Sequence, residues 1–265
     1  MRFKTVWVSD VHLGSKGCSA SEFIDFIEST DFDTLIMNGD IIDGWRLKAK
    51  WFFPQEHVNA IRKVLGLSRQ GKKIIYVTGN HDEFLRKFHD FDLEIGNITI
   101  LNKYVHSIGD KKYLVVHGDG FDTIVRYHKW VAVIGDVAYN LLLGANRYLT
   151  MMRSWFNLKP WSLSKYAKSK VKGAADFIFK FEESAVHAVM NKYHGIICGH
   201  IHHPEIKVYG NTLYGSHAVY LNSGDWVETC SWIGETDDGR LQAWEWNDGE
   251  PFMIKEYYRG QIKEQ

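Results

Sequence analysis

Five apolar segments of the chain each end in a short polar cluster, and this repeated order constrains the fold more than any other feature. The clusters stand at 9–10 (Ser-Asp), 38–40 (Asn-Gly-Asp), 78–82 (Thr-Gly-Asn-His-Asp), 117–119 (His-Gly-Asp) and 199–202 (Gly-His-Ile-His). Open α/β sheets bind ligands just beyond the carboxyl ends of their strands. Five strands that carry such residues to one edge of a sheet therefore predict a functional site at that edge.

The first third of the chain alternates strand-like and helix-like segments. Strands are predicted at 4–10, 33–40 and 72–82, and helices at 21–29 and 57–71. Ser21 is the predicted N-cap of the first helix, and Gly71 ends the second. This alternation indicates βαβ units and a largely parallel sheet. Near the C-terminus, residues 211–228 alternate as strands do, and residues 236–246 predict a hairpin with Asp-Gly at its turn.

The composition is that of a globular protein. A chain of 265 residues, 45% hydrophobic and 24% charged, can bury a core, and we predict a single domain over residues 1–265. The strand–helix rhythm stops at about 122–193, which we interpret as a helical insertion that forms a lid over the polar edge. Residues 121–180 carry ten Lys and Arg against three Asp, a net charge of +7 in a chain whose formal net charge is +0. The lid is therefore basic as well as rich in large apolar side chains.

The cysteines and the apolar segments favour a cytoplasmic location. Cys18, Cys198 and Cys230 are odd in number and show no paired spacing, which fits a reducing compartment. Asp10 interrupts the N-terminal segment before a secretory signal could form, and no run of about eighteen apolar residues exists to span a membrane. Peripheral contact with the cytoplasmic face of the inner membrane stays compatible with this sequence.

The polar clusters supply seven candidate metal ligands. They are Asp10, His12, Asp40, Asn80, His117, His200 and His202. Carboxylate, amide and imidazole ligands without cysteine suit Mn²⁺, which we expect first, and also Fe or Zn²⁺. Seven ligands are too many for one tetrahedral ion but suit two divalent ions about 3.5–4 Å apart that share a bridging carboxylate. Each motif taken alone also occurs in ordinary turns; their joint appearance after five apolar segments favours the metal site.

These motifs resemble those of the calcineurin-like metallophosphoesterase superfamily, from residue 9 to residue 202. The resemblance implies an α/β fold, an α-β-β-α sandwich with the helical lid inserted. It also implies that one ion is held by Asp10, His12, Asp40 and His202, and the other by Asp40, Asn80, His117 and His200. Hydroxide bridging the ions would attack the phosphate. His81 would act on the substrate as a catalytic residue, and Asp82 would orient it.

The segments 39–45 (GDIIDGW) and 223–226 (SGDW) are similar to the UDP-2,3-diacylglucosamine pyrophosphatase group of lipid A biosynthesis, with the GNHD motif of a divergent subgroup. That resemblance implies hydrolysis of UDP-2,3-diacylglucosamine to UMP and 2,3-diacylglucosamine 1-phosphate. Candidate substrate-binding residues are Asn80, Arg126, Lys165, Lys168 and Lys172, and two acyl chains would need an apolar groove in the lid. The alternative for the lysines is a solvated helix face.

Three other functions compete with this one. A phosphodiesterase or phosphatase acting on another nucleotide or lipid diphosphate would use the same metal ligands. A non-enzymatic scaffold is disfavoured because no ligand is missing. A nucleic-acid enzyme is disfavoured because the positive charge is confined to one segment beside large apolar residues. The expected partner is thus a nucleotide-linked glycolipid or another small phosphodiester.

Overall fold

The computed structural model describes residues 1–91, 94–95, 97–121, 172–211, 216–247 and 249–264. The chain divides into two compact units, one formed by Met1–Gly120 with Ala185–Gln265 and the other by Phe121–Ser184. Most of the predicted lid, residues 122–171, lies outside the described residues. Its described part is helix α7 (Lys172–Val189), which begins in the second unit and ends in the first.

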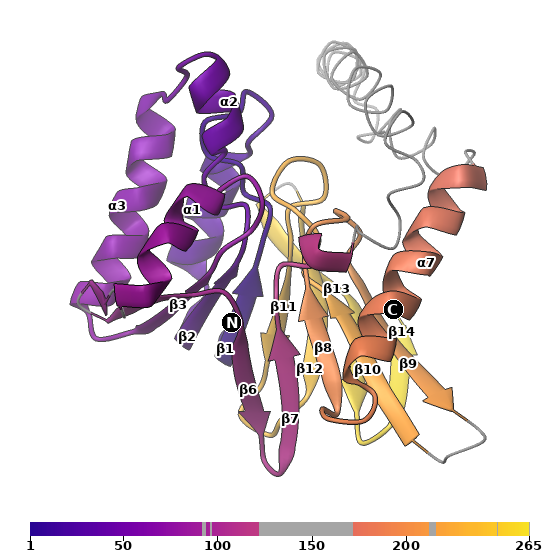
Figure 1. Cartoon of the computed structure of the whole chain (residues 1–265). Helices are drawn as coiled ribbons and strands as arrows, with labels where there is room; N and C mark the ends of the chain where they lie inside the picture. The colour runs from indigo at the N-terminus through magenta and orange to yellow at the C-terminus, as the bar shows by residue number, and fades with distance from the viewer. Residues whose placement is uncertain (92–93, 96, 122–171, 212–215, 248, 265) are drawn as a thin grey trace, which may run out of the picture. The chain divides into compact units, whose positions relative to one another are not determined.

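The first unit contains two β-sheets, shown in Figure 1. The nine-stranded sheet has the order β14 (Gln261–Glu264), β13 (Glu250–Tyr258), β12 (Leu241–Asn247), β11 (Ser231–Glu235), β1 (Arg2–Val8), β2 (Asp31–Asn38), β3 (Lys73–Val77), β5 (Ile98–Leu101), β4 (Glu94–Ile95). The five-stranded sheet has the order β6 (Tyr104–Ile108), β7 (Lys111–Val115), β8 (Gly195–Cys198), β10 (Ser216–Asn222), β9 (Glu205–Asn211). The α/β fold predicted from the sequence is confirmed.

Helices of the first unit lie beside the N-terminal strands (Figure 1). They are α1 (Ala20–Ser29), α2 (Gly44–Ala49) and α3 (Gln55–Arg69). The 3₁₀ helix η1 (Glu83–Phe91) follows β3, and a second one, η2 (Asp119–Phe121), follows β7 of the five-stranded sheet. The predicted N-cap is wrong by two residues, because Ser19 and not Ser21 accepts the first helical hydrogen bond, from Phe23 N at 3.0 Å. No helix among the described residues is long and apolar enough to cross a membrane.

Alternating side chains on β1, β2 and β3 divide the interior into two apolar cores. On β1, Val6 and Val8 belong to the core that includes residues of α1 and α3. Trp7 between them belongs to a second core, with residues of β7, β8, β9 and β10 from the other sheet. On β3, Ile74 and Ile75 divide in the same way. The three N-terminal strands are therefore buried on both faces, which explains their continuous apolar sequence.

The largely parallel sheet predicted from the first third of the chain is confirmed there, and β7, β8 and β10 of the other sheet also pair in parallel. Strands β1, β2, β3 and β5 pair in parallel, whereas β11–β14 pair antiparallel and extend the sheet from β1. The predicted hairpin is confirmed as β11 and β12, joined by a turn with Gly239 at φ +81°.

The polar clusters follow β1, β2 and β3 of one sheet and β7 and β8 of the other. The predicted edge is therefore formed jointly by the carboxyl ends of both sheets. Asn38 links the two sheets beneath it, since its Nδ2 donates to the carbonyl oxygens of Val116 at 3.0 Å and Ile197 at 3.2 Å.

Candidate metal centre

Five of the seven predicted ligands have positive backbone φ angles, which are unfavourable for residues other than glycine. The angles are +53° at Asp10, +54° at His12, +56° at Asp40, +70° at His200 and +52° at His202. Hydrogen bonds between the loops hold this conformation: Asp10 N donates to Gly39 O at 3.0 Å, and His12 N to Asp40 O at 2.9 Å. Such strain persists where surrounding contacts enforce it, commonly at functional sites.

One group of converging side chains is formed by Asp10, His12 and His202. His202 Nε2 lies 3.2 Å from Asp10 Oδ1 and 3.4 Å from His12 Nε2. The other oxygen, Asp10 Oδ2, accepts a hydrogen bond from His200 N at 2.8 Å, while the buried Oδ1 accepts none from the described residues. The unsatisfied oxygen and the two imidazole nitrogens thus face a common point.

A second group is formed by Asp40, His117 and His200. His117 Nδ1 lies 3.0 Å from Asn38 O and donates to it, which leaves Nε2 as the basic nitrogen. That Nε2 lies 3.2 Å from Asp40 Oδ2 and 3.2 Å from His200 Nδ1.

Both groups fit divalent cations. Donor atoms bound to one ion at about 2.1 Å lie roughly 3.0–3.4 Å from each other. The four separations given above, 3.2 and 3.4 Å in the first group and 3.2 Å twice in the second, are of this size, and Asp10 Oδ1 lies 3.7 Å from His12 Nε2. Asn80 adds a buried side-chain oxygen, Oδ1, that has no hydrogen-bond partner among the described residues. A buried amide oxygen without a donor is costly, so a cation would satisfy it. These clusters could hold divalent metal ions.

The charges of the site depend strongly on one another. Burial lowers the pKa of His12, yet hydrogen bonds to Asp10 and Asp43 raise it to about 10. Burial raises the pKa of Asp40, yet the adjacent His117 lowers it to about 2. Divalent cations compete with protons for these imidazoles, so we expect cation binding to release protons.

His81 stands beside the first group with a carboxylate behind it, and that carboxylate is Asp43. His81 Nδ1 lies 2.9 Å from Asp43 Oδ1, and the His81 ring packs on the Trp45 ring with centroids 4.2 Å apart. The side chain of His81 keeps 24% of its surface exposed, so it is accessible to a substrate. Hydrogen bonds from His12, His81 and the Arg46 amide outweigh burial and hold the pKa of Asp43 well below its ordinary value.

Asp82, the residue predicted to orient His81, makes its hydrogen bonds elsewhere. It is fully buried and accepts from Tyr76 Oη at 2.6 Å, Gly79 N at 2.5 Å and Ile41 N at 3.0 Å. Asp82 therefore ties the loop that carries Asn80 to the loop that carries Asp40.

Asp43 was not predicted from the sequence, although an N-cap signal could have identified it. It lies three residues after Asp40 and just before a short helix, a position typical of an N-cap. Its Oδ1 accepts a hydrogen bond from Arg46 N at 2.9 Å.

The SGDW segment supports the loop structure behind the centre. Asp225 Oδ1 accepts hydrogen bonds from the amides of Val227 at 2.8 Å, Glu228 at 2.5 Å and Thr229 at 3.3 Å. Trp226 is fully buried against Phe23, with ring centroids 5.1 Å apart.

Four of the five predicted substrate-binding residues belong to the predicted lid. Arg126, Lys165 and Lys168 lie outside the described residues, and so does the side chain of Lys172, the first residue of α7.

Comparison with known proteins gives one match to a protein family. A family model described as calcineurin-like phosphoesterase matches residues 3–204, which include all seven predicted ligands. Among solved structures, the chain is similar to vacuolar protein sorting 29 from Cryptosporidium parvum (TM-score 0.46, 14% identity, 96% of this chain and 97% of that chain). It is also similar to a predicted phosphoesterase from Streptococcus pneumoniae (TM-score 0.40, 14% identity, 99% and 97%). No curated protein sequence matches the chain.

Proposed function

This chain belongs to the calcineurin-like phosphoesterase family, and from this premise we propose that it hydrolyses the diphosphate of UDP-2,3-diacylglucosamine with two divalent ions. Family membership supports a metal-dependent phosphoester hydrolase. The observation that carries the catalytic part of the proposal is the placement of His81, supported by Asp43, beside two groups of ligands that could each hold an ion.

The residues of the site have distinct proposed roles. Asp10, His12 and His202 would hold one ion, Asn80, His117 and His200 would hold the other, and Asp40 would contribute to both. Bound divalent ions would supply positive charge to the phosphate oxygens and lower the pKa of water. Mn²⁺ is the ion that we propose, with Fe or Zn²⁺ as alternatives.

His81 acts on the leaving group. With Nδ1 held by Asp43, Nε2 is the nitrogen free to carry a proton toward the substrate. Water oxygen forms a bond to phosphorus as the bridging P–O bond breaks, and His81 Nε2 donates its proton to the departing oxygen. The products are UMP and 2,3-diacylglucosamine 1-phosphate.

The lipid-linked substrate is supported by the sequence between 122 and 193. The net charge of +7 over residues 121–180 suits a diphosphate, and the large apolar side chains of the same segment suit two acyl chains. An acylated substrate also implies contact with a membrane surface. The resemblance of GDIIDGW and SGDW to the lipid A enzymes adds to this support.

A paired assay tests the proposal. Purified protein with Mn²⁺ is given UDP-2,3-diacylglucosamine or bis(p-nitrophenyl) phosphate, and UMP or p-nitrophenol release is measured. We expect UMP release from the lipid substrate with a higher kcat/KM than for the generic ester. Cleavage of the generic ester alone would rule out UDP-2,3-diacylglucosamine as the substrate. It would indicate instead a phosphodiesterase that acts on another nucleotide or lipid diphosphate. A preparation that binds no divalent ion and hydrolyses neither compound would instead indicate a non-enzymatic scaffold.

A further inference from the structure

Exposed aromatic side chains gather on α2 and on the segment that follows it. The sequence of residues 45–53 is WRLKAKWFF. Trp45 is 48% exposed, Phe84 43% and Trp51 75%, and no other large apolar side chain in the described part of the chain is as exposed as Trp51. A group of large apolar side chains at the surface often marks a site of interaction.

These aromatic side chains belong to one region of the surface. The Phe84 ring lies against the first residue of α2, where an added Cβ would be 2.9 Å from it. The ring centroids of Trp51 and Phe53 are 6.0 Å apart. Because α2 has six residues and rises about 1.5 Å per residue, Trp45 near its start and Trp51 just beyond its end are neighbours. We call residues 44–53 together with Phe84 the α2 surface.

The α2 surface is basic. Arg46, Lys48 and Lys50 are exposed, and residues 44–53 contain no acidic side chain. Lys48 and Lys50 form no ion pair with another described residue. One carboxylate, that of Glu83, borders the surface and accepts a hydrogen bond from the indole nitrogen of Trp45 at 3.2 Å. Cations therefore outnumber carboxylates, and the surface is complementary to an anionic partner.

The α2 surface is attached to the loops that carry the metal ligands. The Trp45 ring packs on the His81 ring, and Gly44 N donates a hydrogen bond to His81 O at 3.0 Å. Leu47 packs against Gly14, where an added Cβ would lie 2.7 Å from Leu47 Cγ. Figure 1 shows α2 at one end of the first unit, beyond the strands. A partner bound to the α2 surface would therefore lie beside the metal centre.

We propose that the α2 surface docks on an anionic phospholipid bilayer and holds the metal centre at the membrane. Tryptophan rings are favoured at the boundary between lipid and water because they are amphipathic. Lysine and arginine near this boundary are attracted by anionic headgroups, and exposed aromatic rings beside cations are typical of segments that lie on a membrane. The purpose of docking rests on the acylated substrate of the proposed function, whereas docking itself can be measured without that substrate.

Co-sedimentation with vesicles tests the docking. The metal-loaded full chain is mixed with vesicles of phosphatidylcholine, with or without phosphatidylglycerol, in the absence of substrate. We expect binding to require phosphatidylglycerol and to weaken as salt is raised, because salt screens the charges of exposed side chains. The variant Lys48→Gln/Lys50→Gln/Trp51→Ala should bind at least roughly tenfold more weakly, since each cation near an anionic surface contributes to the affinity.

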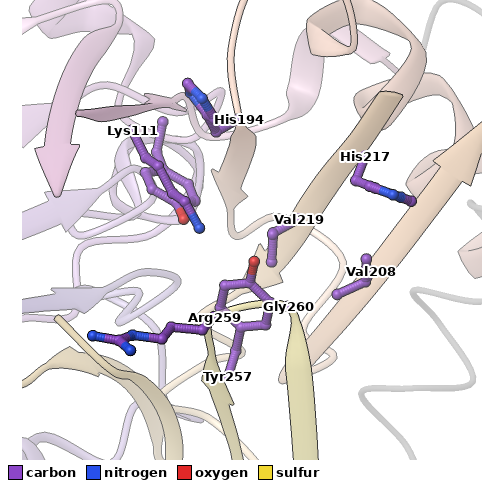
Figure 2. A pocket seen from close by; sticks show the side chains of 9 residues that line it. Lys111, His194, Val208, His217, Val219, Tyr257, Arg259 and Gly260 are labelled. Atoms are coloured by element: carbon purple, nitrogen blue, oxygen red, sulfur yellow. The ribbon is translucent and has the colours of Figure 1, made fainter. Parts of the chain in front are cut away.

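A matched control removes the same kinds of side chain from the edge of the nine-stranded sheet. Phe252→Ala/Arg259→Asn/Lys263→Gln deletes one exposed aromatic ring and two exposed cations from β13, β14 and the turn between them. Arg259 has φ +48°, which asparagine tolerates. Figure 2 shows the Arg259 side chain directed away from the other residues labelled around the neighbouring cavity, so its loss should leave them in place.

The control should bind vesicles as tightly as wild type. Equal binding by wild type and the α2 variant, or an equal loss in both variants, would overturn the proposal. Tighter binding of single-stranded DNA than of anionic vesicles would also overturn it, because exposed aromatic rings beside cations would then be serving as a platform for stacked bases.

Fluorescence quenching by brominated lipids locates the inserted ring. Trp51→Phe keeps an aromatic ring and should retain most of the vesicle binding. It should nevertheless lose part of the quenching of tryptophan fluorescence that brominated phosphatidylcholine and phosphatidylglycerol cause in wild type. Undiminished quenching in Trp51→Phe would show that a tryptophan elsewhere in the chain enters the bilayer, contrary to the proposal.

Hydrolysis measurements keep this test separate from that of the proposed function. Both triple variants should hydrolyse bis(p-nitrophenyl) phosphate at the wild-type rate, because neither changes a residue of the metal centre. Vesicle binding that is lost in the α2 variant, without hydrolysis of UDP-2,3-diacylglucosamine, would retain the docking surface and reject the substrate. Hydrolysis of that substrate without any vesicle binding would retain the substrate and reject the docking surface.

Discussion

At the scale of single residues, neighbours in sequence point in opposite directions around the metal centre. His81 faces outward to Asp43 and Trp45, whereas Asp82 turns inward to Tyr76 and the backbone. The sequence could predict that His81 and an acidic side chain act together. It could not identify the acid, because the partner depends on how the loop after β2 meets the loop after β3.

The first prediction separates metal binding from action on the substrate. Asp40→Ala should lower the content of both ions and remove activity, because the shared carboxylate is lost. His81→Ala should keep the metal content and lower kcat by roughly 10²–10⁴-fold, the usual contribution of an acid or base. Metal content by atomic emission and turnover of bis(p-nitrophenyl) phosphate measure the two effects. An empty site in His81→Ala would contradict the assigned roles.

At the scale of elements, the ends of the strands pack so closely that glycine is needed between them. A Cβ on Gly79 would collide with Asp40 Oδ1, and one on Gly199 would lie 2.5 Å from Asp10 Oδ2. A Cβ on Gly39 would collide with the His117 ring. Each of these glycines follows one strand and meets a predicted ligand carried by another, so the sequence's Gly-Asp, Gly-Asn and Gly-His pairs reflect close packing as well as tight turns.

The second prediction compares two glycines. Gly79→Ala should displace the Asp40 carboxylate, because the added Cβ would collide with Asp40 Oδ1. The affinity of the site for metal should therefore fall. Gly66→Ala is the matched control, because nothing lies within 4 Å of a Cβ there. In the last turn of α3 it should stabilise the protein by up to about 0.8–1 kcal/mol. Competition with a chelating dye measures the metal affinity of each variant, and urea unfolding measures its stability. Equal metal affinity in the two variants would show that the Asp40 side chain can move aside without loss of metal binding.

At the scale of the whole first unit, the family resemblance predicted a sandwich of two sheets, but the strands that belong to each sheet could not be predicted from the sequence. The polar cluster after each of β1, β2, β3, β7 and β8 is visible in the sequence. The assignment of β7 and β8 to a separate sheet depends on distant pairings, such as β8 with β10 and β1 with β11. Local apolar patterns do not encode such pairings, since a strand buried on both faces has the same sequence in either sheet.

The last prediction concerns a buried contact between the two sheets. Glu235 on β11 lies with Oε2 2.7 Å from Nε2 of His106 on β6, and Lys4 Nζ lies 3.4 Å from its other oxygen. Burial raises the pKa of Glu235, but the hydrogen bond from His106 outweighs it and lowers the pKa below its ordinary value. Because the pKa of Glu235 is lower in the folded protein, its ionised carboxylate stabilises the folded state at any pH above the unfolded-state pKa of about 4.3. This contribution is lost as the pH falls through the folded-state pKa.

Glu235→Gln should therefore lower the free energy of unfolding at pH 7 by roughly 1.5–3 kcal/mol, the range for a hydrogen bond to a charged group. The difference from wild type should narrow below about pH 4, where Glu235 itself becomes protonated. Glu264→Gln is the control, because Glu264 is 69% exposed in its pair with Lys255 and should change stability by less than about 1 kcal/mol. Urea unfolding in EDTA across this pH range excludes the contribution of metal binding. A constant difference at every pH would mean that packing, and not the charge of Glu235, joins the sheets at this point.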